Sequence, residues 1–105
     1  MFSITLTTVS NKENGLLIAR ELTKARLCAC VNILEGATSV YFWKGELCEE
    51  SELLLFIKAP QENFEKIKEK ILELHEYELP EIVELPIGQG YEKYLKWIEE
   101  ETRLS

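Results

Sequence analysis

Apolar and polar residues alternate from the second position of the chain, which predicts that it opens with a β-strand. The apolar members share one face: Phe2, Ile4 and Leu6. We expect this face to lie against the core. The opposite face carries hydroxyl side chains that tolerate water, so Thr5 and Thr7 are expected on the open side of the sheet.

Two later stretches place apolar residues at helical spacing. The motif at 10–13, Ser-Asn-Lys-Glu, predicts a capping box at the start of a first helix. The buried side of that helix is expected to include Ile18, Leu22 and Ala25. Pro60 opens a second helix, whose apolar positions are Phe64, Ile67, Ile71 and Leu74. A short strand at 81–85 and a C-terminal helix around Tyr91, Tyr94, Leu95 and Ile98 complete the chain.

Between the two main helices, residues 28–58 read as two long strands joined at Lys44-Gly45. Residues 28–43 would span roughly 50 Å if extended, whereas a compact domain of this length has a diameter of about 33 Å. The hairpin must therefore bend back or project. Its tip carries Tyr41, Phe42 and Trp43, which we expect to contact another subunit because large aromatic side chains are costly to leave in water.

The predicted order is β-α-β-β-α-β plus a C-terminal helix, an α+β ferredoxin-like split βαβ fold. It implies an antiparallel sheet with both main helices on one face. The second hairpin strand has Leu53, Leu55 and Ile57 on one face and Leu54 and Phe56 on the other, as a strand buried on both sides would. Burying one Leu or Phe is worth about 1.5–3 kcal/mol, so we expect Leu54 and Phe56 to favour an oligomer.

Composition narrows the class of protein. The 105 residues suit a single domain spanning 1–105, and the net charge of −7 argues against nucleic-acid binding while favouring weak attraction of cations. No signal peptide is expected, and the apolar runs are too short to span a membrane. Three cysteines without a Cys-x-x-Cys motif indicate free thiols, hence a cytoplasmic protein.

Segments along the whole chain resemble the CutA divalent-cation tolerance proteins. The resemblance is carried by 25–32 (ARLCACVN), 36–46 (GATSVYFWKGE), 57–58 (IK), 75–82 (HEYELPEI) and 94–98 (YLKWI). It implies a ferredoxin-like fold, a tight homotrimer whose long hairpins pair between subunits, and a role in tolerance of copper and other divalent metals without an established catalytic reaction. The chain departs from the family at Glu76, because the family usually has His-Pro-Tyr where this chain has His75-Glu76-Tyr77. It also has Thr7 and Leu74 where some members carry a cysteine and a second histidine.

His75, Cys30 and Glu76 are the metal-ligand candidates for ions such as Cu(II) or Zn(II), with no obligatory cofactor expected. Imidazole and thiolate are good ligands for both metals. Competing interpretations are that His75 caps the last turn of its helix and that Cys28 and Cys30, expected on one strand face, are packing residues. Cys48 has no evident partner. Because no closed site can be assembled from these residues, we expect weak binding or binding shared between subunits.

A second set of residues could line a cleft between subunits: Trp43, Lys58, Tyr77, Glu81 and Trp97. The competing interpretation is that they only anchor the assembly. No nucleophile elbow, phosphate loop or zinc-protease motif is present in the sequence, so we expect no enzyme. The leading hypothesis is a homotrimeric protein of divalent-cation tolerance. A ligand-responsive regulatory trimer similar to the PII proteins and a scaffold trimer without a small ligand are the alternatives.

Overall fold

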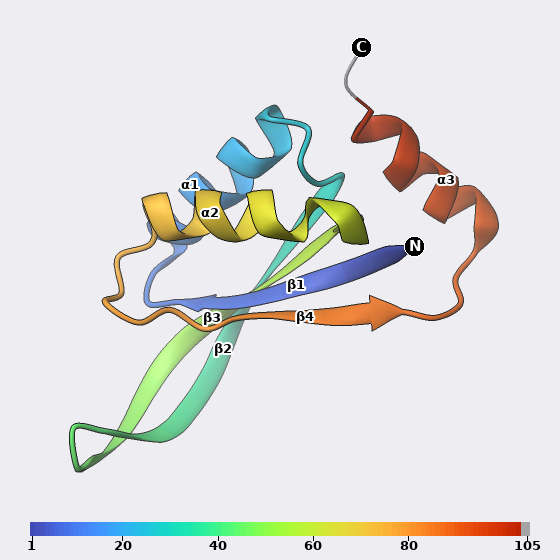
Figure 1. The fold of residues 1–105 in the computed structure, drawn as a ribbon. Helices are drawn as coiled ribbons and strands as arrows, with labels where there is room; N and C mark the ends of the chain where they lie inside the picture. The colour runs from blue at the N-terminus through green and yellow to red at the C-terminus, as the bar shows by residue number, and fades with distance from the viewer. Residues whose placement is uncertain (104–105) are drawn as a thin grey trace.

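The chain folds into one four-stranded antiparallel sheet with helices on one side of it, as the computed structural model of residues 1–103 shows (Figure 1). The strand order is β2-β3-β1-β4, which confirms the predicted α+β ferredoxin-like arrangement. Its elements are β1 (Phe2–Val9), α1 (Lys12–Lys24), β2 (Cys30–Trp43), β3 (Glu46–Pro60), a 3₁₀ turn (Gln61–Asn63), α2 (Phe64–Leu74), β4 (Ile82–Ile87) and α3 (Glu92–Glu101).

The β2–β3 hairpin projects beyond the helices, which is one of the two outcomes that its length required (Figure 1). The molecule measures 46 × 26 × 21 Å, and it extends from the tip of the hairpin at one end to α3 at the other (Figure 1). Lys44 and Gly45 both have positive φ (51° and 83°), which suits a two-residue turn joining antiparallel strands. A register shift between Leu34 and Ala37 adds one residue to β2, at the Glu35-Gly36 break seen in the sequence.

The core lies between the helices and one face of the sheet. Leu55 and Ile57 of β3 are fully buried there. They meet the apolar sides of α1 and α2, which supply Ile18, Leu22, Ile67 and Ile71. Gly15 of α1 allows close approach, since a Cβ at this position would lie 3.3 Å from Val9 and 3.4 Å from Leu55.

The faces of β1 are the reverse of the prediction. Ser3, Thr5 and Thr7 lie under the helices with at most 2% exposure, while Phe2, Ile4 and Leu6 lie on the other face. The pairing with β3 explains this: Thr5 faces Ile57 and Thr7 faces Leu55, so the hydroxyl side of β1 shares the helix-covered face with the most buried residues of β3. The prediction that Thr5 and Thr7 point to the open side is wrong.

Three local predictions also need correction. The N-cap of α1 is Asn11 rather than Ser10, because the Asn11 side chain accepts a hydrogen bond from the Asn14 amide at 2.7 Å. Ala25, expected on the buried side, is exposed because it lies at the C-cap, beyond the last turn of α1. The second helix begins at Phe64, since a 3₁₀ turn follows Pro60.

No helix covers the other face of the sheet in residues 1–103 (Figure 1). We call this the open face. Its apolar rows follow from the strand register: Leu6 lies between Phe56 and Val83, and Ile4 lies between Lys58 and Leu85. Val83 is 44% exposed and Leu85 46% exposed. The open face is therefore more apolar than the sequence predicted, because β1 adds its own apolar residues to those of β3.

Candidate functional site

A cleft lies where the hairpin leaves the sheet. Its volume is about 590 Å³, and it lies between the outer part of the hairpin and the segment that follows α2. It is lined by Thr8, Tyr41, Phe42, Trp43, Glu50, Glu52, Glu76, Tyr77, Glu78, Leu79 and Glu81. Five of these residues are glutamates and none is a lysine or arginine, so the cleft is strongly acidic.

The strand register explains how the hairpin side of the cleft forms. Glu50 and Glu52 are two residues apart on β3 and therefore point to the same face. By the same alternation they share this face with Leu54 and Phe56, so the cleft continues the open face of the sheet. Tyr41 and Trp43 of β2 pair with Cys48 and Glu46 of β3. Because side chains alternate along β3, Cys48 and Glu46 point to the same face as Glu50 and Glu52. Tyr41 and Trp43 therefore share the face of these two glutamates.

Glu52 and Tyr77 connect the two walls of the cleft. The Tyr77 hydroxyl donates a hydrogen bond of 2.6 Å to a carboxylate oxygen of Glu52, which is only 8% exposed. Burial, followed by this bond and by the negative charge of Glu52, raises the pKa of Tyr77 well above its usual range. Tyr77 thus stays a neutral donor, and Glu52 is held as a buried carboxylate in the wall of the cleft.

His75 is the C-cap residue of α2, and both of its ring nitrogens have partners. Nε2 lies 2.7 Å from the Thr8 carbonyl oxygen, and Nδ1 accepts a hydrogen bond from the Tyr77 amide at 3.1 Å. These partners fit a neutral ring protonated on Nε2. A metal could bind Nδ1 only if the Tyr77 bond broke, so the structure shows a tethering role for His75 that sequence pattern alone left open.

The three candidate metal ligands do not meet within one chain. Glu76 adjoins His75, but its carboxylate accepts a hydrogen bond from the Asn11 side chain at 3.0 Å. Cys30 pairs with Lys58, whereas His75 contacts Thr8, whose partner is Leu54. Four strand residues, about 13 Å, separate those positions along β3. In residues 1–103, no group of three or more His, Cys, Asp or Glu side chains is placed to hold a metal ion.

The expectation that Cys28 and Cys30 share one strand face is wrong. Cys28 precedes β2 and is buried in the core, where burial raises the pKa of its thiol to about 11 although Thr23 hydrogen-bonds to it. Cys30 is the first residue of β2 and, opposite Lys58, lies on the open face. Cys48 is half-buried on the hairpin, and all three cysteines are free. Burial makes Cys28 a packing residue.

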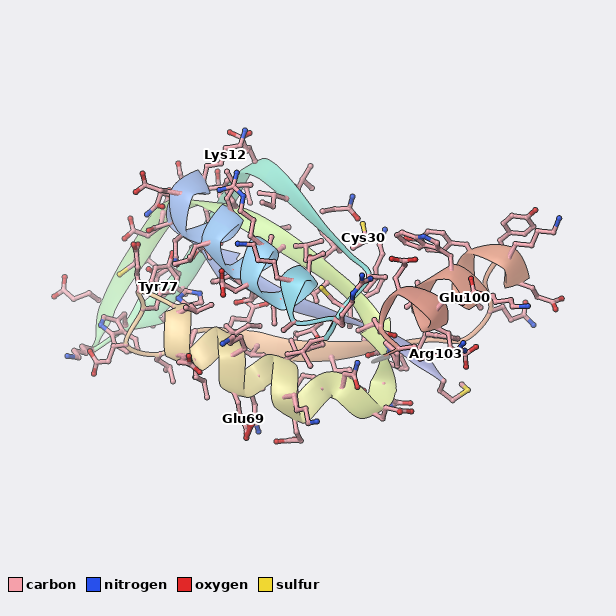
Figure 2. The ribbon with its side chains drawn as sticks, turned by 90° about the horizontal axis from the view of Figure 1, so that it is seen from above. Lys12, Cys30, Glu69, Tyr77, Glu100 and Arg103 are labelled. Atoms are coloured by element: carbon pink, nitrogen blue, oxygen red, sulfur yellow. The ribbon has the colours of Figure 1, made fainter. Side chains whose placement is uncertain are left out.

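The predicted cleft residues fall into two groups at opposite ends of the sheet. Trp43, Tyr77 and Glu81 line the acidic cleft. The ammonium group of Lys58 instead lies 5.8 Å from the centre of the Tyr94 ring, which stacks on Trp97 of α3 at 5.6 Å. Lys58 is six residues beyond Glu52 on β3, about 20 Å along the strand. In Figure 2, Tyr77 lies on the side of the hairpin and Cys30, the strand partner of Lys58, lies on the side of α3.

The sequence analysis missed Glu50, Glu52 and Glu78 as cleft residues. The alternation of Glu50 and Glu52 in a predicted strand does indicate a shared acidic face. That Glu52 is buried could not be read from the sequence, because it depends on contact with Tyr77, 25 positions further along.

The interface candidates are all accessible to a second copy, although in different ways. Phe42 at the hairpin tip is 75% exposed, and Tyr41 is 40% exposed. Trp43, Leu54 and Phe56 are half-buried, the last two on the open face. Leu54 and Phe56 form one apolar surface with Val83 and Leu85 of β4.

Comparison with known proteins agrees with the resemblance in the sequence. A family model described as CutA1 divalent ion tolerance protein matches residues 3–101. The chain belongs to this family. The divalent-cation tolerance protein CutA of Thermus thermophilus is 47% identical over 97% of this chain and 99% of that protein. Its solved structure superposes with a TM-score of 0.94 over 98% of this chain and 100% of that one.

Other members of the family carry different descriptions. A structure titled PII-like protein CutA, from Nostoc, is 38% identical and superposes with a TM-score of 0.88, covering 98% of this chain and 99% of that one. The chloroplastic CutA of Arabidopsis thaliana is 44% identical, and the match covers 91% of this chain but 53% of that protein. A CutA structure from Archaeoglobus fulgidus is described as periplasmic. No helix in residues 1–103 of this chain is long and apolar enough to cross a membrane.

Proposed function

We propose that this protein acts as a homotrimer in divalent-cation tolerance, through weak binding of metal ions and without a catalytic reaction. The observation that carries the proposal is the acidic cleft, which is lined, among residues 1–103, by five glutamates and by no lysine or arginine. Such a cleft concentrates cations near the protein. Membership of the CutA1 family makes divalent metal ions the first cations to consider.

The trimer is supported by the open face of the sheet. Its apolar rows and the exposed hairpin tip form a surface that soluble monomers rarely leave uncovered. An assembly of copies around a common axis would bury this surface on every copy. The trimeric number itself comes from the family resemblance.

Weak binding follows from the placement of the candidate ligands. His75, Glu76 and Cys30 would need groups from a neighbouring copy to complete a coordination shell for Cu(II) or Zn(II), because one chain does not bring them together. In addition, the ring nitrogen of His75 would have to give up the Tyr77 amide. These costs lower the affinity without abolishing the attraction of the acidic cleft.

The test is a titration of the purified oligomer with Cu(II) and Zn(II), comparing the wild type with His75→Ala, Cys30→Ala and Glu76→Gln. We expect the wild type to bind these metal ions weakly. A substitution should reduce this binding wherever the replaced residue is a metal ligand. If all four proteins bound the metal ions equally, the proposal that His75, Cys30 and Glu76 are metal ligands would be wrong. Absence of binding beyond nonspecific association would favour a scaffold trimer that has no small ligand.

A second candidate is ligand-responsive regulation, as in the PII proteins, with a cleft completed between copies. The separation of Trp43, Tyr77 and Glu81 from Lys58 and Trp97 supports it, because only two adjacent copies could unite these groups. A small anion would have to bind near Lys58, since the glutamates of the acidic cleft repel it. A thermal-shift screen of nucleotides and carboxylates tests this, and we expect Lys58→Gln to abolish any response.

We also propose the cytoplasm as its compartment. The three free cysteines support a reducing environment, since exposed thiols tend to oxidise elsewhere. Fractionation of the native host with an antibody against the protein tests this directly, and recovery in a periplasmic or organelle fraction would contradict it.

A further inference from the structure

Arg26 has a left-handed backbone conformation just after α1. Its φ is 62°, and among the non-glycine residues of 1–103 only Lys44, at the hairpin turn, also has a positive φ. The Arg26 amide donates to the Thr23 carbonyl at 3.0 Å. The Leu27 amide donates to the Leu22 carbonyl at 3.1 Å. These bonds form a Schellman motif, whose left-handed position is usually glycine. Arginine is unfavourable for the backbone there, so its side chain has to account for its presence.

The Arg26 side chain reaches the last turn of α3. Its Nη1 donates to the Glu101 carbonyl oxygen at 3.1 Å and to the Glu101 carboxylate at 3.0 Å. The carbonyls of a last helical turn lack partners within their helix, and a cation is favourable beside them. Arg26 and Glu101 are 75 positions apart in the sequence. Their contact therefore joins the end of α3 to the end of α1.

Few other groups of α3 are packed against the rest of the chain. Ile98 is the one buried residue within α3, whereas α1 buries five residues. Figure 1 shows α3 standing apart from α1 and α2. The segment 88–91 before α3 contains two glycines, and nothing in residues 1–103 lies within 4 Å of a Cβ built at Gly88. A helix with one buried side chain and an unpacked linker is suited to opening as a unit.

Tyr94 of α3 reaches the rim of the open face of the sheet. Its ring lies 5.8 Å from the Lys58 ammonium and stacks on Trp97. Lys58 is half-buried, although its strand position places it on the open face beside Ile4. Movement of α3 away from the sheet would uncover the Lys58 ammonium and expose Ile98.

We propose that α3 is a hinged strap that closes over Lys58, and that Arg26 is the latch that holds it closed. The two bonds from the Arg26 side chain to Glu101 offset the unfavourable backbone of Arg26. The inference goes beyond the proposed metal and anion binding and depends on neither of them. It assigns to α3 the control of access to the Lys58 ammonium.

The first test is hydrogen–deuterium exchange of the intact oligomer, read by mass spectrometry in residues 88–103 and, as a reference, in α2. Arg26→Ala and Arg26→Gly both remove the latch, but only glycine relieves the left-handed backbone. We expect the α3 amides of both variants to exchange about threefold to tenfold faster than those of the wild type. The midpoint of thermal unfolding should nevertheless be higher for Arg26→Gly than for Arg26→Ala. Opening of α3 would then follow the latch and not the overall stability.

The second test is the rate at which N-hydroxysuccinimidyl acetate modifies the Lys58 amine, relative to the exposed Lys66 of α2. We expect this ratio to rise in Arg26→Ala and in Arg26→Gly, because an open strap uncovers Lys58. Arg26→Lys should restore part of the wild-type behaviour in both tests, since an ammonium group can still donate to Glu101.

Arg103→Gln is the matched control. Arg103 also lies at the end of α3, but its ion pair is with Glu99 of that same helix, so it does not link α3 to α1. We expect it to change neither α3 exchange nor Lys58 acetylation. Wild-type exchange rates in the α3 of Arg26→Gly would overturn the inference. Equal acceleration in α2 and α3 would also contradict it, because the whole fold would then be opening. Faster α3 exchange with unchanged Lys58 acetylation would show that the strap does not cover Lys58.

Discussion

Tyr77 holds two of its neighbours, Glu52 through its side chain and His75 through its backbone. Its hydroxyl is the donor to that carboxylate at 2.6 Å, and its amide fixes the ring of the neighbouring His75. Tyr77→Phe removes only the hydroxyl. It should lower the free energy of unfolding by about 1–3 kcal/mol, because it leaves a buried carboxylate without its donor. Urea denaturation of the variant measures this.

Tyr91→Phe serves as the control for that substitution, since Tyr91 is 71% exposed. We expect no measurable change from it. Equal stability of Tyr77→Phe and the wild type would mean that water replaces the phenol, and Glu52 would then be less isolated than the structure indicates.

The Cys28 thiol makes the free energy of unfolding depend on pH in the alkaline range. Its pKa is raised from 9.0 to about 11 by burial, so below pH 9 the thiol is protonated in both the folded and the unfolded state. Between pH 9 and 11 the unfolded chain loses this proton first, and stability falls by up to about 3 kcal/mol as pH rises. Cys28→Ala should flatten the decline.

The measurement is the free energy of unfolding from pH 8 to 11 for the wild type, Cys28→Ala and the control Cys48→Ala. Tyr77, whose pKa is also raised, contributes a decline in the same direction to all three proteins. The difference between wild type and Cys28→Ala therefore isolates the thiol. Parallel curves for these two proteins would contradict the assignment.

At the scale of elements, the sequence predicts most of the fold, because strand alternation and helical spacing are local signals. They correctly indicate the order of elements, the long hairpin and the turn at Lys44-Gly45. The orientation of β1 could not be predicted, since both of its faces are compatible with a strand. It is decided by the register with β3, which places Thr5 and Thr7 beside Ile57 and Leu55.

The candidate site was less predictable than the fold, for a similar reason. Trp43, Tyr77 and Glu81 do meet in the acidic cleft, but Lys58 belongs to the same strand as Glu52 and lies far along it. Spacing within a strand predicts which face a residue occupies. It does not predict which distant loop covers that face, and contacts such as Tyr77 with Glu52 arise only from that packing.

The reversed face of β1 leads to a prediction about its hydroxyls. The Thr7 hydroxyl is buried and has no hydrogen-bond partner among residues 1–103, and the same is true of the Thr5 hydroxyl. Thr7→Val preserves the shape and removes the unpaired polar atom, so stability should stay equal or increase by about 1 kcal/mol. Thr102→Val is the control with the opposite sign, because the Thr102 hydroxyl donates to the Ile98 carbonyl at 2.8 Å.

Thermal and urea unfolding of both valine variants check this prediction. We expect Thr102→Val to lose stability by about 1 kcal/mol through loss of its hydrogen bond. A loss of similar size in Thr7→Val would show that the Thr7 hydroxyl of the wild type is paired in solution, for example with a buried water. The close contact of β1 with the helices would then need to be revised.

At the scale of the whole molecule, the apolar open face and the acidic cleft adjoin each other on one side of the sheet. A copy that covers the open face would therefore lie beside the cleft. This proximity couples the proposed assembly to the proposed ligand site. The sequence indicated association through Leu54 and Phe56, and β1 and β4 add further apolar residues at Ile4, Leu6, Val83 and Leu85.

The open face predicts where a single charge disrupts assembly. Leu85→Glu places a carboxylate among the apolar rows, and removing a buried leucine alone costs about 1.5–3 kcal/mol per copy. Leu72→Glu, on the outer side of α2, introduces the same charge at a residue of similar exposure, 54% against 46%. Analytical ultracentrifugation at micromolar concentration should show loss of the oligomer only for Leu85→Glu, because only that face needs a partner. An oligomer that survives in Leu85→Glu, or is lost equally in Leu72→Glu, would mean that the copies associate through another surface.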